Sequence, residues 1–351
     1  MLCKQLHNFL GLLVEFFLCF KVMSQIENCP FLLVRRAACH QEHEGGVSEI
    51  PIVEWEELVC LEDSVAAKST KGTEEACRAA ALWLVRCGEL SRASKVLTSA
   101  GLAPSTADTA KKLASKHPPR VKSIDLLNTP HSAAINLSEN VFCDTVRRSP
   151  RGSGVGPSGW RFEHFKVLID NENTAKCLFS ACSAIAKGIL PPEIAQLMSS
   201  SRLIALSKSN GDLRPIAVGD ALRRRTDRAI CAQKKEAFAD YFTPIQHGVS
   251  TQNGTELVAH HIGLMLEVNQ NWIVLKSDVR NAFNSISRCD MLKEVSKAFP
   301  DLFSHIQQMY GHSSSLVYLQ GLSSIVIPSQ EGVHQGDPLG PVLLATTSYF
   351  I

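Results

Sequence analysis

The chain has 351 residues, of which 45% are hydrophobic and 20% charged, with 36 Lys and Arg against 34 Asp and Glu. This composition excludes a predominantly disordered protein, because enough apolar side chain is present to offset the entropy lost on folding. At roughly 100 to 200 residues per domain, the length predicts two or three domains. The net charge of +2, taken as a whole, argues against a nucleic-acid-binding protein.

The first 50 residues form a poorly defined N-terminal segment. An apolar run covers residues 9–20, with Glu15 inside it and Lys21 directly after it. The run is shorter than the ~20 apolar residues of a membrane span, and no cleavage site of small residues follows it. We therefore expect a buried or ill-defined helix and no membrane association, with a secretory signal as the less favoured alternative.

Twelve cysteines are spread along the chain without dense clusters. A protein of this length does not need disulfides for stability, so the pattern predicts reduced thiols and an intracellular protein, nuclear or cytoplasmic. Cys29, Cys39, His40 and His43 come nearest to a metal-binding set, but they lack the closely spaced cysteine pair of a zinc site. Buried or surface thiols are the favoured interpretation.

Residues 51–117 are rich in Ala, Leu, Glu, Lys and Arg, which predicts a helical region with a break at Gly88. Nothing in this region has the pattern of a catalytic motif. Several prolines and the sequence RRSPRGSGVGPSG then predict a linker over residues 118–158. The glycine spacing is not that of a phosphate-binding P-loop, because no Gly-Lys-Ser/Thr follows.

From residue 159 to residue 351 helices alternate with short strands, which predicts a helix-rich α/β (α+β) domain. Asn210-Gly211 is a strong signal for a hairpin between two of the strands. The predicted strands cover residues 202–206, 213–218 and 272–275, followed by a hairpin of LVYLQ and SIVIPS. The predicted helices cover about residues 160–169, 175–189, 220–242, 254–268, 288–298 and 302–310, and a last helix starts between residues 337 and 341.

The segment 272–275 is apolar throughout, which is typical of a buried strand, and it leads into Lys276, Ser277 and Asp278. A carboxylate buried there would need a cation or hydrogen bonds to offset the cost of losing water. Asp278 could cap the following turn by accepting from backbone amides. Alternatively, it could bind a divalent metal for phosphoryl transfer.

Three neighbouring features favour the metal-binding interpretation. Lys208 and Arg214 form a basic pair, in and just after the predicted hairpin loop, that can neutralise a triphosphate. Gln335 and Gly336 precede the last predicted helix, where a glycine allows a base or sugar to approach the backbone closely. Phe283 can form one wall of a sugar-binding pocket. Each feature alone has a simpler interpretation, such as a solvated hairpin or a core aromatic residue.

In their order along the chain, the motifs RLIAL, GDLRPI, QHGVS, LKSDVRNAFNSI and EGVHQGDPLGP resemble the fingers and palm of reverse transcriptases, especially those of non-LTR (LINE-like) retrotransposons. GPSGWRFEHFK is similar to the segment just upstream of the fingers in that group. The resemblance covers the chain from about residue 154 onward. The preceding helical region is similar, more weakly, to the region before the polymerase in such elements.

The resemblance implies an RNA-directed DNA polymerase, with fingers and a partial palm, that uses Mg²⁺, deoxynucleoside triphosphates, an RNA template and a DNA primer. Asp278 would be the first of three metal-binding carboxylates, and the backbone of Val279 would line the triphosphate. Lys208 and Arg214 would contact the phosphates. Phe283 would be a steric gate whose ring excludes the 2′-hydroxyl of ribonucleotides.

The resemblance gives further residues roles at the template. Gln335 and Gly336 would lie beside the templating base and the new pair, and Asp337 would shape that turn. Arg223 and Arg224 would follow template phosphates. Their neighbour Arg225 departs from the pattern, because it occupies an apolar position of its helix. It could extend its charged end to solvent, or the chain could be a decaying copy of such an element.

The family's second carboxylate pair lies in a Phe/Tyr-x-Asp-Asp hairpin beyond the QGDPLGP motif, and no such sequence occurs in this chain. Two-metal catalysis holds ions ~3.5 to 4 Å apart, which a single Asp cannot do. We therefore expect a polymerase-family fragment that is inactive alone. A non-catalytic RNA- or DNA-binding remnant and a helical interaction protein are the alternatives. Residues 202–235 carry nine basic residues against three acidic ones, which favours nucleic acid as a partner.

Overall fold

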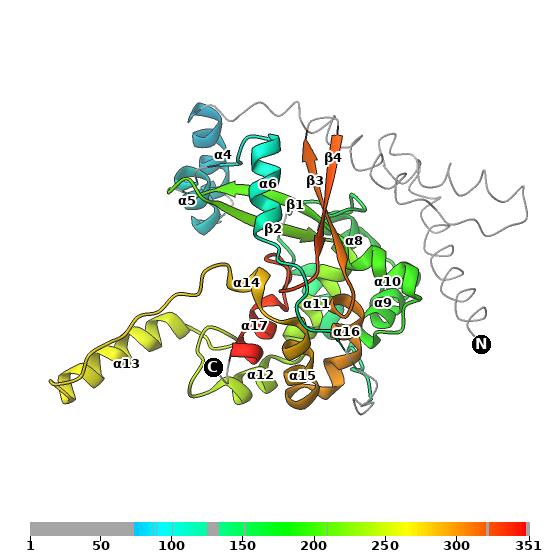
Figure 1. The fold of residues 1–351 in the computed structure, drawn as a ribbon. Coiled ribbons are helices and arrows are strands. Elements are labelled where there is room, and N and C mark those ends of the chain that lie inside the picture. Colours follow the sequence, from blue (N-terminus) through cyan, green and yellow to red (C-terminus); the bar gives the residue numbers. More distant parts are fainter. Residues whose placement is uncertain are drawn as a thin grey trace, which may run out of the picture.

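The computed structural model describes residues 74–348, apart from residues 87, 89, 100, 125–132, 151, 209 and 321–322. The expectations for residues 9–20 and for the Cys29–His43 set lie outside the described residues. A body of helices carries a four-stranded sheet on one side (Figure 1). The fold is therefore mixed α/β and rich in helices, as the sequence predicts.

The four strands are β1 (Ser201–Ser207), β2 (Leu213–Gly219), β3 (Ser314–Gln320) and β4 (Ser323–Ser329), in the order β2-β1-β3-β4. Pairs β1–β2 and β3–β4 are antiparallel hairpins, and both were predicted. The two hairpins join through β1 and β3, which are parallel over residues 201–203 and 316–318. This central contact combines segments more than a hundred residues apart, so no local pattern predicts it.

The N-terminal described part consists of three helices, α4 (Glu74–Arg86), α5 (Leu90–Thr98) and α6 (Ala107–Ser115). Gly88 separates the first two with a φ of 77°, and the predicted break is confirmed there. The Thr106 side chain accepts a hydrogen bond from the Thr109 amide and so caps α6. Ala110 and Leu113 of α6 pack against buried residues of the sheet, which fixes the C-terminal end of α6 beside the β1–β2 hairpin.

The helical body surrounds a core that includes the fully buried side chains of Phe165, Leu178, Ile230 and Met291. Its helices are α8 (Phe162–Leu168), α9 (Glu172–Lys187), α10 (Pro192–Ser199), α11 (Ala221–Gln233), α12 (Lys235–Phe242), α14 (Ala282–Ser285), α15 (Arg288–Ala298), the 3₁₀ turn η2 (Pro300–Leu302), α16 (Phe303–Tyr310) and α17 (Gly340–Ser348). The helix predicted from residue 220 to 242 is two helices that meet at Lys234.

The segment 118–158 is more than the linker that its prolines and glycines suggest. It contains α7 (Glu139–Arg147), whose Phe142 and Val146 are completely buried in the main core. These two residues are one helical turn apart, so both lie on the face that meets the body. The apolar pattern is only nine residues long and stands between turn-forming sequences, which is why its periodicity is weak in the sequence.

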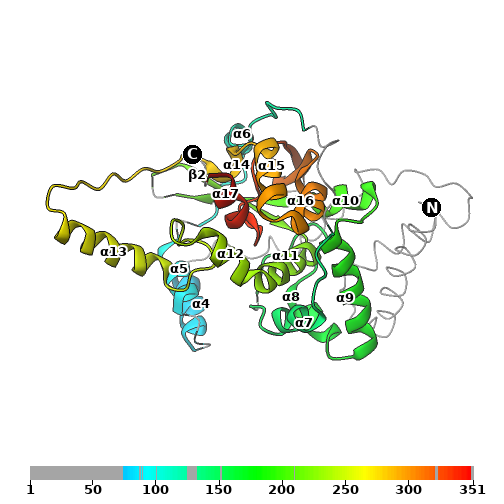
Figure 2. The same ribbon diagram turned by 90° about the horizontal axis from the view of Figure 1, so that it is seen from below.

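The predicted strand at 272–275 is wrong. Ile273 and Leu275 are 91% and 90% exposed, and no strand of the described chain lies beside them. An apolar, β-branched sequence favours a strand, but a strand forms only when a neighbouring backbone accepts and donates its hydrogen bonds. The preceding helix, α13 (Gly254–Val268), was predicted correctly, yet it projects away from the body in both views (Figures 1 and 2).

Among the described helices, none is by itself both long and apolar enough to cross a lipid bilayer. Only α9 and α10 taken together reach the required length and hydropathy, and they are bent by 93° where they meet. Both helices contribute buried residues to the main core. The cysteines in the described part of the chain are free thiols: Cys77, Cys143, Cys177, Cys182, Cys231 and Cys289.

Candidate functional site

A pocket of about 570 Å³ lies between the β1–β2 hairpin, the segment 277–284 and α17. Its volume is in the range of small-molecule sites, which is about 300 to 1,000 Å³. Six of the nine residues that the sequence singles out line this pocket: Lys208, Arg214, Asp278, Val279, Phe283 and Gln335. The fold thus brings together three segments that are widely separated in the sequence.

The β1–β2 hairpin places Lys208 and Arg214 at the pocket. The amide of Lys208 donates to the carbonyl of Asp212 at 2.8 Å, and Gly211, with a φ of 78°, allows the tight turn between them. Leu213 and Pro215 are buried, whereas Arg214 between them is exposed. The alternation of a strand therefore turns Arg214 away from the core and toward the pocket.

Asp278 lies on the opposite wall, in an exposed segment. Within the described chain no hydrogen bond or ion pair is found at its carboxylate, and the residue at the start of α14 is Asn281. The structure therefore does not show Asp278 as a cap of the following turn. The turn is instead held by Asn281, whose side-chain oxygen accepts from the Asn284 amide group at 2.7 Å and whose carbonyl accepts from the Ser285 hydroxyl at 2.9 Å.

Two backbone hydrogen bonds bring Phe283 close to Gln335. The amide of Val333 donates to the carbonyl of Phe283 at 2.6 Å, and the amide of Gly332 donates to the carbonyl of Ile286 at 2.8 Å. Phe283 is half-buried, packs on the main core and lines the pocket. It therefore forms a firmly supported aromatic wall beside the site.

Gly336 does not line the pocket. A Cβ atom at this position would lie 2.4 Å from the carbonyl oxygen of Ala217 on β2, so only a glycine allows the turn to pack this closely. The sequence predicted close approach by a base or sugar. In the described structure, the group that approaches is the backbone of β2.

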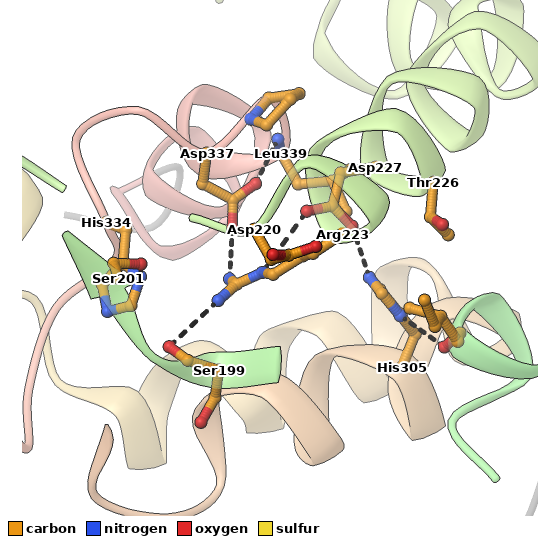
Figure 3. A network of polar contacts seen from close by, with 12 residues as sticks. Ser199, Ser201, Asp220, Arg223, Thr226, Asp227, His305, His334, Asp337 and Leu339 are labelled. Carbon is orange, nitrogen blue, oxygen red and sulfur yellow. Dashed lines mark hydrogen bonds and ion pairs between the residues drawn. The ribbon is translucent and has the colours of Figure 1, made fainter. Parts of the chain in front are cut away.

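Arg223 is part of a buried polar network (Figure 3). Its guanidinium lies 2.6 Å from the carboxylate of Asp337, which precedes α17, and 3.5 Å from that of Asp227, one turn further along α11. The Tyr310 hydroxyl donates to the same oxygen of Asp337. The network therefore ties the turn that carries Gln335 to α11, which agrees with the expectation that Asp337 shapes this turn.

His305 extends the network on the other side of Asp227. Its Nε2 atom is 2.7 Å from the Asp227 carboxylate, and both side chains are 1% exposed. Burial by itself would lower the pKa of His305, but the hydrogen bond and the negative charge of Asp227 more than offset it, so the pKa is raised. The imidazole and the Arg223 guanidinium thus share the buried Asp227 carboxylate.

The structure places Arg223 and Arg224 in the interior, so they are not surface cations that follow a template. Arg223 is 2% exposed and engaged by two carboxylates. Arg224 donates to the carbonyl of Gly154 at 2.7 Å and lies over the ring of Phe162. Their charges are therefore used inside the protein.

Arg225 is buried as well, and the expectation that it extends to solvent is wrong. Its guanidinium carbon lies 3.6 Å from the centre of the Phe162 ring, and Nη1 donates to the carbonyl of Thr145 at 3.4 Å. Burial and the neighbouring charges of Arg224 and Arg228 lower the pKa of Arg225 to about 10. An aromatic face thus replaces water as its partner.

Sequence reasoning missed Lys116, Asp212 and Arg280 as pocket residues. Lys116 follows α6, in a region without a catalytic motif, and its Nζ atom lies 2.8 Å from the carboxylate of Asp212, 96 residues further along the chain. No signal in the sequence links two residues so far apart. With these residues, the lining holds four cations and two carboxylates, an excess of two positive charges.

The pocket suits one magnesium ion better than two. Asp278 is a free carboxylate, whereas Asp212 is already paired with two lysines. Across the described residues no group of three or more His, Cys, Asp or Glu side chains is arranged to hold a metal. Magnesium is often held by one or two carboxylates together with substrate phosphates, so Asp278 fits an ion that arrives with a polyphosphate. It does not fit a two-metal centre.

The lining can bind a polyphosphate ester, because it combines four cations, the carboxylate of Asp278 and the ring of Phe283. A search of protein-family models finds no match for the chain.

Proposed function

We propose that this chain contains the fingers and part of the palm of a reverse transcriptase of the non-LTR retrotransposon type, and that its pocket binds a deoxynucleoside triphosphate with Mg²⁺. The observation that carries the proposal is that one pocket collects six residues for which the sequence resemblance implies contact with the nucleotide or its metal. In this proposal Lys208 and Arg214 bind phosphates, Val279 lines them, Phe283 faces the sugar and Gln335 lies near the base.

Mg²⁺ bound with the triphosphate supplies positive charge that offsets the phosphates. Asp278 is the residue that would hold it, because its carboxylate is exposed, lines the pocket and has no protein partner in the described structure. A single carboxylate does not hold the second ion that nucleotidyl transfer requires in this family. We therefore propose that the described residues bind a nucleotide but do not, by themselves, transfer it to a primer.

Titration calorimetry of the full chain with dATP and Mg²⁺ tests the binding proposal. Lys208→Gln and Arg214→Gln are each expected to weaken binding by about tenfold or more, because each removes a charge-assisted hydrogen bond. Lys176→Gln is the matched control, since Lys176 is an exposed lysine of α9 paired only with Glu172. No binding of dATP by the native chain, or equal affinities of all three variants, would contradict the proposal.

Phe283→Ala tests the orientation of the nucleotide. The native chain is expected to bind dATP more tightly than ATP, because in this proposal the ring would clash with a 2′-hydroxyl. The variant is expected to bind the two nucleotides about equally. A preference that survives the substitution would show that Phe283 does not face the sugar.

A non-catalytic nucleic-acid-binding protein is the second candidate, and the excess of two positive charges in the pocket lining favours it. Primer extension on an RNA template with Mg²⁺ and deoxynucleotides is expected to give no product. Extension that disappears in Asp278→Asn would refute the inactivity. Binding of the RNA–DNA duplex is expected to weaken as salt rises, and an affinity that does not change with salt would exclude phosphate recognition.

A further inference from the structure

Lys116 connects both walls of the pocket to the end of α6. Its backbone closes the helix by donating to the carbonyl of Leu113 at 3.0 Å. Its own carbonyl accepts a hydrogen bond from the Asn281 side chain at 2.7 Å, in the turn that follows Asp278. Its ammonium group reaches the opposite wall, at Asp212 of the hairpin turn. The position of Lys116 is therefore fixed by the same segments that form the site.

Asp212 gathers two ammonium groups at one edge of the pocket. The Nζ atom of Lys116 lies 2.8 Å and 3.0 Å from its two carboxylate oxygens, and the Nζ atom of Lys208 lies 3.3 Å from one of them. Hydrogen bonding from Lys116, then from the Leu213 amide and Lys208, lowers the pKa of Asp212. The carboxylate is thus ionised at neutral pH, and one of the two lysine charges remains uncompensated.

These three side chains are open to a ligand. Lys116, Lys208 and Asp212 are 21%, 39% and 43% exposed, and all three line the pocket. Ion pairs of this exposure contribute little to folding, so their alignment has no strong structural purpose. An ammonium group has three donors, and Asp212 occupies only part of them on each lysine. The remaining donors can bind phosphate oxygens.

We propose that Lys116 is a third phosphate-binding residue of this pocket, beside Lys208. The inference rests on the proposed function and extends it, because it assigns part of triphosphate recognition to the helical region that precedes the polymerase-like part. Lys116, Lys208 and Arg214 are then three cations that line the same pocket. Three cations favour a triphosphate over a monophosphate, because the added phosphates can pair with the further cations.

Titration calorimetry of the full chain with Mg²⁺ and dATP, dAMP or inorganic tripolyphosphate tests the proposal. Lys116→Gln is expected to weaken binding of dATP and tripolyphosphate by about tenfold or more and to change dAMP binding much less. Lys116→Arg keeps the charge and is expected to stay within a few fold of the native affinity. Lys112→Gln is the matched control, because Lys112 lies one turn earlier in α6, paired with Asp108 and outside the pocket.

Asp212→Asn separates phosphate binding from a purely structural role. If Lys116 binds phosphate, removal of the neighbouring negative charge leaves the affinity for tripolyphosphate unchanged or raises it. If Lys116 acts only by pairing with Asp212, the two substitutions weaken binding alike, and the proposal is overturned. Native affinity in Lys116→Gln would overturn it while leaving the proposed function intact. A native chain that binds no triphosphate would overturn both.

Discussion

Gly336 lies where the turn before α17 packs directly on β2, and the 2.4 Å between a would-be Cβ atom and the Ala217 carbonyl makes it sensitive to any substitution. Gly336→Ala is expected to lower the free energy of unfolding by about 1 to 3 kcal/mol, the usual cost of overpacking. Gly263→Ala in exposed α13 is the control, because nothing lies within 4 Å of its would-be Cβ atom. Urea unfolding measures the free energy of unfolding of both variants. Equal values for Gly336→Ala and Gly263→Ala would contradict the close packing at Gly336.

His334 is a buried histidine with a pH-dependent effect on stability. Burial, followed by the charges of Arg223 and Arg288, lowers its pKa well below the ordinary 6.5. When pH falls below 6.5, the unfolded chain therefore takes up this proton before the folded chain does. The contribution of His334 to the free energy of unfolding is therefore fully present above pH 6.5. It is lost as the pH falls toward the pKa that His334 has in the folded chain.

Urea unfolding of His334→Gln at several pH values between 7.5 and 5 tests this contribution. The variant is expected to lose less stability on acidification than the native chain, since glutamine does not titrate there. His260→Gln is the control, because His260 is exposed on α13. If the variant loses as much stability at low pH as the native chain, a group other than His334 causes the loss. His305 does not cause it, because its pKa is raised and its contribution to stability increases as pH falls.

A buried charge pair connects α11 to the turn before α17. Asp337→Asn leaves the Arg223 guanidinium, 2% exposed, with a weaker partner and is expected to cost about 3 to 5 kcal/mol, the penalty for breaking a buried ion pair. Asp144→Asn breaks the exposed pair with Arg147 and is expected to change stability by at most about 0.5 kcal/mol. Thermal or urea unfolding compares the two, and similar effects would contradict the buried network.

The exposed apolar surface of α13 affects the behaviour of the whole molecule. Leu264 is 61% exposed, and the segment after α13 adds Trp272 at 60%. Leu264→Glu is expected to reduce association at high concentration and binding of the dye ANS, while the free energy of unfolding changes by at most about 0.5 kcal/mol. Leu292→Ala in α15, fully buried, is expected to cost about 2 to 5 kcal/mol. Unchanged dye binding in Leu264→Glu would contradict the exposure.

Charge distribution over the molecule differs from what composition indicates. Of the nine basic residues at 202–235, Arg223, Arg224 and Arg225 are buried in the described structure. Two of them meet the ring of Phe162, and the third meets two carboxylates. The basic surface is therefore smaller than the count suggests, and of the other six residues Lys208 and Arg214 line the pocket.

Local sequence patterns determined much of this protein. Turn residues such as Asn210-Gly211 and the alternation around Arg214 specify the first hairpin, because their effects extend over only a few residues. The sequence also pointed to six of the residues that line the pocket, five of them from local motifs and Val279 only through the family resemblance. Helices α13 and α15 were also predicted from the sequence, with bounds that match the structure.

Tertiary structure decided the features that depend on a distant partner. Residues 272–275 have the composition of a strand, but no neighbouring backbone in the described chain completes it. Arg223 has the appearance of a surface cation until Asp337 folds against it. Lys116 becomes a pocket residue only because α6 packs on the sheet. Burial and pairing are properties of the folded arrangement, and the residues around a site do not encode them locally.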